Sequence, residues 1–333
     1  MEFALSEEQS ELAATVRAVL DRHADPAAVR RAMAAEQGHD PDLWERLCTQ
    51  VGVAALAVPE EYDGFGASFF EAAVALEEIG RSLAPSPLLA TVVATEALLA
   101  GGDAAARERL LPRIAAGSIA TLALDEEVVL DGDRAGIVLG LSPDGSDLVE
   151  VDVTGTAPRW RESMDQTLRL ARVSPDAPRT PIGDGTAARE RAELVGSAGA
   201  AALAVGLCDR ALRMTVDHSA EREQFGRPIG SFQALKHRMA DMLARLEIAR
   251  SASWAASHAL ADPETAAEQA AYLTHAAASY GGEAAAHLAG ECIQLHGGIA
   301  ITWEHDAHLV FKRAHALGQL FGAPHEHRSR IPL

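Results

Sequence analysis

The chain has 333 residues, which is enough for two or three domains with a sizeable core. Hydrophobic residues make up 48% of it and aromatic residues only 5%, which favours packed helices and argues against both a disordered chain and a β-sandwich. The formal net charge of −19 argues against nucleic acid and anionic membranes as partners.

The cysteines and the hydrophobic runs indicate a cytoplasmic protein. Cys48, Cys208 and Cys292 are few and widely separated, which is typical of reduced thiols. The first residues lead directly into the acidic pair Glu7 and Glu8, and they do not have the pattern of a signal peptide. No apolar run reads as a membrane span, so we expect no membrane partner.

Residues 1–118 have the pattern of a helical domain. Ser6 precedes acidic residues, as at a helix start, and apolar residues then recur every four positions. Further helices are expected from Pro41 and from about Phe69. A loop rich in proline and glycine, over residues 58–66, separates these two helices.

Residues 119–188 have a different pattern, which predicts a small sheet domain. Short β-like runs cover residues 121–124, 136–139 and 148–151, and turns rich in Asp and Gly separate them.

Residues 189–333 predict a bundle of four helices. We expect helices over residues 188–218, from about residue 232, over residues 263–292 and from about residue 304. Their length suits an antiparallel four-helix bundle. The fold class expected for the whole chain is therefore mainly α with a small β domain.

The turn over residues 221–233 is unusually rich in functional side chains. Two glycines and a proline force a turn between two helices. The planar guanidinium of Arg222 or Arg227 suits a phosphate, and the free backbone N–H groups of a helix start near Ser231 would favour the same anion. An ordinary helix–helix turn with solvated arginines is the equally good alternative.

A second turn, at Gln294-Leu295-His296-Gly297-Gly298, has paired glycines that permit close backbone approach. Together with the first turn it resembles the acyl-CoA dehydrogenase family. The resemblance implies FAD as cofactor and a neighbouring subunit that meets the ADP half of the flavin. It also implies these cofactor-binding residues: Arg222, Gln224, Phe225, Ile229, Phe232, Gln233, Gln294, Gly297 and Gly298.

The same resemblance implies three domains. They are an N-terminal helical domain (residues 1–118), a truncated middle β domain (119–188) and a C-terminal helical bundle for flavin binding and oligomerisation (189–333). The middle domain departs most from the family. The family's flavin-ring segments are not found there, although Trp160 is present. The run over residues 163–173 resembles the strand by which the chain leaves the middle domain in that family.

The catalytic glutamate of the family is not found at either of its usual positions. One position falls at residues 321–323 and the other at Gly196, and neither has a carboxylate. Glu193 and Glu326 are the nearby acids, and both are weak candidates, because exposed acids of this kind are usually only solvated. The site prediction therefore names no catalytic residue at the usual positions.

The chain thus resembles the short, base-less subunit of actinobacterial-type heterotetrameric acyl-CoA dehydrogenases. This implies α,β-dehydrogenation of an acyl-CoA substrate in a complex with a homologous full-length subunit. It also implies bulky substrates such as steroid side-chain thioesters, and electron-transferring flavoprotein as acceptor. Two alternatives stay open: a non-catalytic interaction or scaffold subunit, and a self-sufficient homo-oligomer with Glu193 as its base.

The thirteen histidines raise the question of a metal site. His305 and His308 lie one turn apart, and His325 and His327 flank an acid. Zinc needs three or four converging ligands, and solvated histidines explain the pattern as well. We expect no metal.

Overall fold

A computed structural model describes residues 4–331 and is mainly α with a small β region, as the sequence predicts. The chain divides into two compact units. We call the first the sheet unit (Leu5–Leu76 and Ala84–Gly196) and the second the bundle unit (Glu77–Leu83 and the chain from Ser197). The three predicted domains, with boundaries at residues 118 and 188, stay a prediction.

Helices form most of the N-terminal part of the chain, and N-capping residues fix where several of them begin. Ser6 accepts from the backbone N–H of Gln9 at 3.2 Å, while the Gln9 side chain accepts from the N–H of Ser6 at 2.9 Å, so both ends of a capping box are present. The helices are α1 (Glu7–His23), α2 (Pro26–Ala34), α3 (Pro41–Arg46), the π-helix η1 (Leu47–Val51), the 3₁₀-helix η2 (Glu60–Tyr62), α4 (Phe69–Ser82), α5 (Leu88–Gly101) and α6 (Ala104–Ala115).

Helix α2 was not predicted from the sequence, although its start has a clear signal. Asp25 accepts from the N–H of Ala28 at 2.7 Å, and Pro26 occupies the first helical position, where its missing N–H costs nothing. The helix has only nine residues, so its apolar repeat is too short to stand out.

Two small sheets follow. The first has the order β1-β3-β4-β7, with β1 parallel to β3 and the other pairs antiparallel, and the second has the order β2-β6-β5. The strands are β1 (Ala120–Ala123), β2 (Val129–Leu130), β3 (Ile137–Leu141), β4 (Asp147–Val151), β5 (Arg159–Arg161), β6 (Leu170–Arg172) and β7 (Arg179–Asp184).

The prediction of the exit strand was wrong. Of the run over residues 163–173 only Leu170–Arg172 is a strand, and the chain leaves the sheets through β7. Strand β7 contains Pro181 and Gly183, which are both unfavourable in strands, and this hid it from the sequence. Gly183 is needed there because a Cβ would lie 2.0 Å from the carbonyl oxygen of Gly101.

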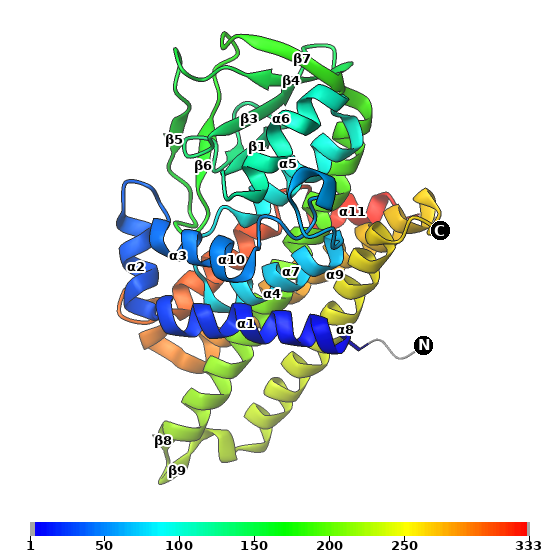
Figure 1. Cartoon of the computed structure of the whole chain (residues 1–333). Coiled ribbons are helices and arrows are strands. Elements are labelled where there is room, and N and C mark those ends of the chain that lie inside the picture. Colours follow the sequence, from blue (N-terminus) through cyan, green and yellow to red (C-terminus); the bar gives the residue numbers. More distant parts are fainter. Residues whose placement is uncertain (1–3, 332–333) are drawn as a thin grey trace. The chain divides into compact units, whose positions relative to one another are not determined.

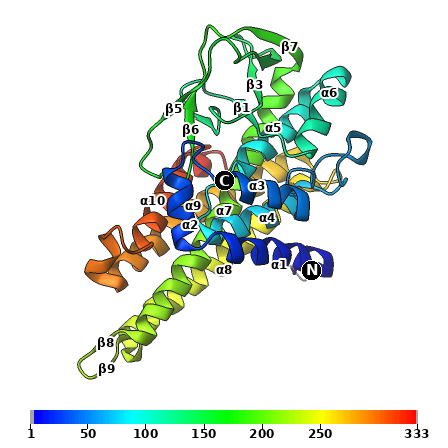
Figure 2. The same ribbon diagram turned by 60° about the vertical axis from the view of Figure 1, so that its left-hand side comes forward.

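The C-terminal helices follow in the expected order: α7 is longer than predicted, α9 has the predicted length but lies four residues later, and α10 begins at Ala307 instead of near residue 304. Figures 1 and 2 show β8 and β9 at the end of the pair formed by α7 and α8. The elements are α7 (Gly185–Glu221), β8 (Glu223–Gln224), β9 (Arg227–Pro228), η3 (Ile229–Ser231), α8 (Gln233–Ala261), α9 (Ala267–His296), η4 (Gly297–Ile301), α10 (Ala307–Leu317) and α11 (Pro324–Ser329). Helix α11 was expected to be a tail rich in histidine.

Helix α7 is long and apolar enough to pass a length-and-composition test for a membrane span, which the sequence analysis did not expect. However, 83% of its most apolar window is buried inside the protein, as in the core helix of a folded domain. Its apolar character is therefore explained by packing.

Within the bundle unit, the end of α4 crosses α7 at very short range because both helices have a glycine there. A Cβ on Gly80 would lie 2.1 Å from the carbonyl oxygen of Leu203, and a Cβ on Gly206 would lie 1.8 Å from that of Glu77. No other residue type fits at either position without separating the two helices.

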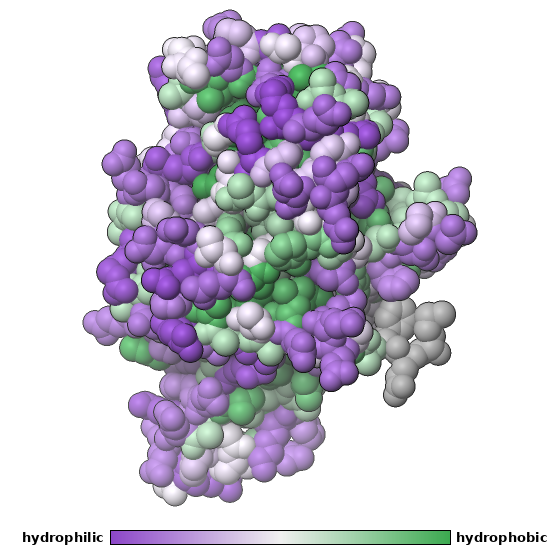
Figure 3. Space-filling view, in the orientation of Figure 1, coloured by the Kyte–Doolittle hydropathy of each residue, from purple (hydrophilic) through white to green (hydrophobic). Residues whose placement is uncertain are grey.

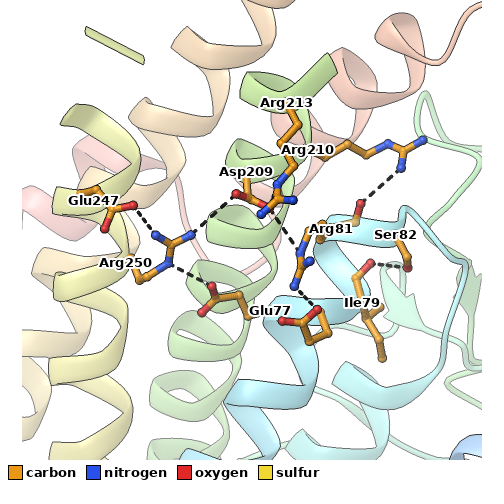
Figure 4. Close-up of polar contacts among 10 residues, drawn as sticks. Glu77, Ile79, Arg81, Ser82, Asp209, Arg210, Arg213, Glu247 and Arg250 are labelled. Atoms are coloured by element: carbon orange, nitrogen blue, oxygen red, sulfur yellow. Dashed lines mark hydrogen bonds and ion pairs between the residues drawn. The ribbon is translucent and has the colours of Figure 1, made fainter. Parts of the chain in front are cut away.

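A network of charged side chains lies beside this crossing (Figure 4). Arg250 of α8 donates to Glu77 at 3.1 Å, and Trp254 donates to the second oxygen of the same carboxylate at 3.0 Å. Arg81 pairs with Asp209 of α7 at 3.3 Å. Burial raises the pKa of Glu77, and the charge of Arg250 only partly opposes this effect. The network therefore ties α4, α7 and α8 together.

Candidate functional site

The candidate site begins at a tight hairpin that joins α7 to α8. Gln224 pairs with Arg227 across two strands of two residues each, so Phe225 and Gly226 form a two-residue loop. Both loop residues have positive φ, 54° and 75°, as in a type I′ turn. The Phe225 ring is 92% exposed, so the turn presents an aromatic ring to the solvent.

Two arginines flank this loop with different surroundings. The guanidinium of Arg227 lies over the ring of Phe232, 4.1 Å from its centroid. Over the residues that the structure describes, the exposed side chain of Arg222 has no partner, and only its backbone is held, by bonds to His218 and Ile229. Arg222 is therefore a free cation that can bind an anion.

The start of α8 adds free backbone donors to the same turn. Its N-cap residue is Phe232, and no side chain caps the helix. The first N–H groups of a helix with 29 residues therefore carry the positive end of its dipole without a side-chain partner. Gln233 Nε2 lies 2.9 Å from His237 Nε2. Ile229, in the same turn, is half-buried.

The second predicted turn lies at the end of α9. Gly297 ends the helix with φ 67° and ψ −145°, a conformation that favours glycine, and its N–H donates to the carbonyl of Ile293. Gln294, Gly297 and Gly298 are exposed, and a Cβ at either glycine would meet nothing within 4 Å. The backbone here is open to close approach by another molecule.

A stack of three histidines lies where α7 and α9 end, next to the two turns. The sequence analysis did not find it. The rings of His218 and His296 are stacked with their centroids 4.4 Å apart, and the ring of His305 lies tilted against that of His296 at 4.6 Å. The Nδ1 atom of His296 lies 2.7 Å from the carbonyl oxygen of Cys292. Burial lowers the pKa of both His218 and His296, which favours the neutral form of these two rings.

A small cavity lies where one of the family's glutamate positions was expected. Phe321 and Gly322 line it, together with Ser197 of α7, small residues of α7 and α9, and His327. Its volume is ≈ 20 Å³, enough for about one water molecule and far too small for an acyl chain. His327 is the only titratable residue in its lining.

The two weak candidates for a base lie elsewhere. Glu193 of α7 is about half exposed, and it pairs with Arg189 at 3.9 Å. Glu326 accepts from the backbone N–H of Ala323 at 2.7 Å, so it caps the start of α11. Glu326 therefore has a structural task.

His327, which is buried, forms a pair with the half-buried His275 of α9. Their Nδ1 atoms lie 3.1 Å apart, so one ring donates to the other. His327 is 3% exposed, and burial together with the neighbouring charges of His275 and Arg330 lowers its pKa to about 4. This pair fixes α11 against α9.

The lowered pKa of His327 predicts that the stability of the protein depends on pH. The unfolded chain takes a proton at His327 near pH 6.5, while the folded chain resists it down to about pH 4. The unfolded state binds more protons in this window, so the free energy of unfolding should fall by about 3 kcal/mol as pH falls through it. Denaturant titrations between pH 7.5 and 4 measure this slope.

The variant His327→Gln should flatten this slope, while His325→Gln, at an exposed neighbouring position, should keep it. The other buried histidines retain a part of the slope in both variants. Equal slopes in wild type and His327→Gln would contradict the assignment.

The predicted histidine pairs do not gather into a metal site. The ring of His308 lies 4.7 Å from that of Trp303, and His305 belongs to the histidine stack. Among the described residues, no three His, Cys, Asp or Glu side chains are grouped so that they could hold a metal ion.

Comparisons with known proteins identify the family. A model of the acyl-CoA dehydrogenase N-terminal domain matches residues 6–118, and a model of the acyl-CoA dehydrogenase C-terminal domain matches residues 183–331. The acyl-CoA dehydrogenase IpdE2 of Mycolicibacterium smegmatis is 44% identical, over 98% of this chain and 98% of that protein. The chain belongs to the acyl-CoA dehydrogenase family. It is therefore a member of a family of FAD-dependent oxidoreductases, as the two turns predicted.

Solved structures agree with this membership. The structure described as "Tcur3481-Tcur3483 steroid ACAD G363A variant" has a TM-score of 0.88 and 28% identity, over 98% of this chain and 96% of that one. The ChsE4-ChsE5 complex from Mycobacterium tuberculosis has a TM-score of 0.90 over 99% of this chain and 98% of that one. At 24% identity, the second likeness shows the fold alone.

Proposed function

We propose that this acyl-CoA dehydrogenase family member is an FAD-binding subunit that acts with a homologous full-length subunit. The observation that carries the proposal is a contrast within the bundle unit. The hairpin presents a free arginine and an exposed ring, whereas the expected base position is a cavity for about one water molecule without a carboxylate in its lining. The chain therefore offers exposed groups that can bind a cofactor, and it lacks a carboxylate at the expected position of the catalytic base.

The residues at the two turns fit FAD. Arg222 is free to pair with a phosphate, the uncapped start of α8 offers N–H groups, and Phe225 offers an apolar face. The first binding edge, at the turn over residues 221–233, also includes Gln224, Ile229, Phe232 and Gln233. Gln294, Gly297 and Gly298 form the second edge, which we assign to the ADP half of a flavin shared with a neighbouring subunit.

When bound, FAD would accept the β-hydrogen of the acyl-CoA as a hydride. The residues of this chain bind and orient the flavin. Removal of the α-proton needs a carboxylate, which we assign to the partner subunit. A bulky or steroid side-chain acyl-CoA as substrate is supported by the similar structure that is described as a steroid ACAD, and electron-transferring flavoprotein as acceptor by the family.

Two other functions predict different outcomes in one experiment. A scaffold subunit would bind a partner without flavin or activity, and a self-sufficient homo-oligomer would be active alone with Glu193 as base. The visible absorption spectrum and dehydrogenation of a steroid side-chain acyl-CoA are measured for the chain alone and for the co-expressed complex. Flavin and activity in the complex only support the proposal. Activity of the chain alone would contradict it.

The glycine pair gives a second test, because its two members differ in backbone conformation. Gly297→Val places a β-branched residue at φ 67°, so it should destabilise the chain itself. Gly298 has open space around it and no positive φ, so Gly298→Val should leave the isolated chain folded. In the complex, the Gly298→Val side chain should block close approach and lower flavin content.

Thermal unfolding of the isolated chain and flavin content of the complex separate these effects. Gly298→Ala is the control, because it adds a single methyl group. A normal flavin content in the Gly298→Val complex would show that this turn is an ordinary connector.

A further inference from the structure

The three-stranded sheet places two arginines in direct opposition. Arg159 of β5 pairs with Arg172 of β6 in the antiparallel register, so their side chains leave the same face side by side. Like charges at such positions destabilise a sheet. Arg161 lies on the same face of β5, because side chains alternate along a strand. Three arginines thus share one face of a small sheet in a strongly acidic protein.

Nearby negative charges neutralise only part of the positive charge of these three arginines. One carboxylate, that of Glu127, lies 2.7 Å from Arg172 Nε and 3.4 Å from Arg161 Nη1. Over the part of the chain that the structure describes, Arg159 has no hydrogen bond or ion pair. Figure 3 shows that the upper part of the view, which holds the two sheets, has a mostly hydrophilic surface with some apolar spots.

The two opposed arginines line a groove of ≈ 260 Å³. Thr156 and Ser174, which have hydroxyl groups, also line it, and so does Asp176. We infer that this groove, the arginine groove, binds a small phosphoryl anion between Arg159 and Arg172. The inference does not depend on the proposed function, because the groove shares no residue with the two turns.

The donor set favours a phosphoryl group over a carboxylate. Two guanidinium groups present planar pairs of N–H donors, and two hydroxyl groups add further donors. A phosphoryl group has three oxygens with which to accept from these donors, whereas a carboxylate has two. Asp176 also lines the groove, and its negative charge opposes any anion there, so the two guanidinium groups have to outweigh it.

Calorimetric titration of the full-length chain in phosphate-free buffer at constant ionic strength tests the inference. The ligands are inorganic phosphate, pyrophosphate and CoA, with malonate as a dianion without phosphorus. We expect saturable binding of the phosphorylated ligands, weakened roughly 10- to 100-fold in Arg159→Gln. The matched control is Arg161→Gln, which removes a charge from the same face outside the groove and should change affinity by less than about twofold.

The ligand series also identifies the source of the anion. Tighter binding of CoA than of pyrophosphate points to the phosphates of CoA, and equal binding points to a free anion. Absence of saturable binding to the wild type, equal weakening by both variants, or equal affinity for malonate would overturn the inference. Both arginines are exposed, and circular dichroism of each variant confirms that it is folded.

Discussion

Replacement of the catalytic glutamate of the proposed partner subunit by glutamine should abolish dehydrogenation by the complex, while Glu193→Gln in this chain should leave most of the rate. A positioned base contributes about 10²- to 10⁴-fold, so the kcat of the partner variant should fall by that factor. Glu193 is half exposed beside Arg189, and its neighbourhood does not bury it as catalysis requires. The measurement is the initial rate with a dye acceptor.

Glu326→Gln is the matched control in this chain. The amide oxygen of glutamine can still accept from the N–H of Ala323, so α11 keeps its cap and the rate should stay near that of the wild type. A large loss of kcat in Glu193→Gln, with flavin content and folding intact, would contradict the assignment of the base to the partner. The chain would then be catalytic by itself.

Arg222→Ala should weaken FAD binding in the assembled complex by ~2–5 kcal/mol, or roughly 30- to 4000-fold in Kd. The cause is the loss of one member of a charge pair that becomes desolvated when the flavin phosphate binds. The stability of the isolated chain should not change, because within the described residues the side chain contacts no partner. The ratio of flavin to protein and a fluorescence titration with FAD measure the effect.

Arg222→Lys separates charge from geometry. It keeps the charge and loses the planar pair of donors, so it should bind FAD with an affinity between those of wild type and Arg222→Ala. Arg46→Ala, an exposed substitution on α3, is the control for a general change in charge. Unchanged flavin content in Arg222→Ala would remove this residue from the site.

The helices were predictable because their periodic pattern is long. Helix α7 was expected over residues 188–218 and covers Gly185–Glu221, and α9 was expected over 263–292 and covers Ala267–His296. Short elements were missed, because one or two turns carry too few apolar residues for a period to appear. Strand β7 was missed because tertiary packing at Gly183 overrides its poor strand propensity.

The site was predictable where its parts lie close together in the sequence. Residues 221–233 form the exposed hairpin as one local unit, and the glycine pair lies at the end of α9 as expected. The histidine stack joins His218, His296 and His305, which are far apart in the chain, so no local pattern could indicate it. The arginine groove depends on strand register, which the sequence alone does not determine.

The backbone of Phe225 has a consequence for the evolution and engineering of this chain. A phenylalanine at φ 54° adopts a left-handed conformation that costs roughly 1–2 kcal/mol, and asparagine would adopt it more easily. Selection for thermostability alone should therefore replace Phe225, and it would remove the ring that the turn presents. The hairpin thus has a trade-off between stability and recognition at a single position.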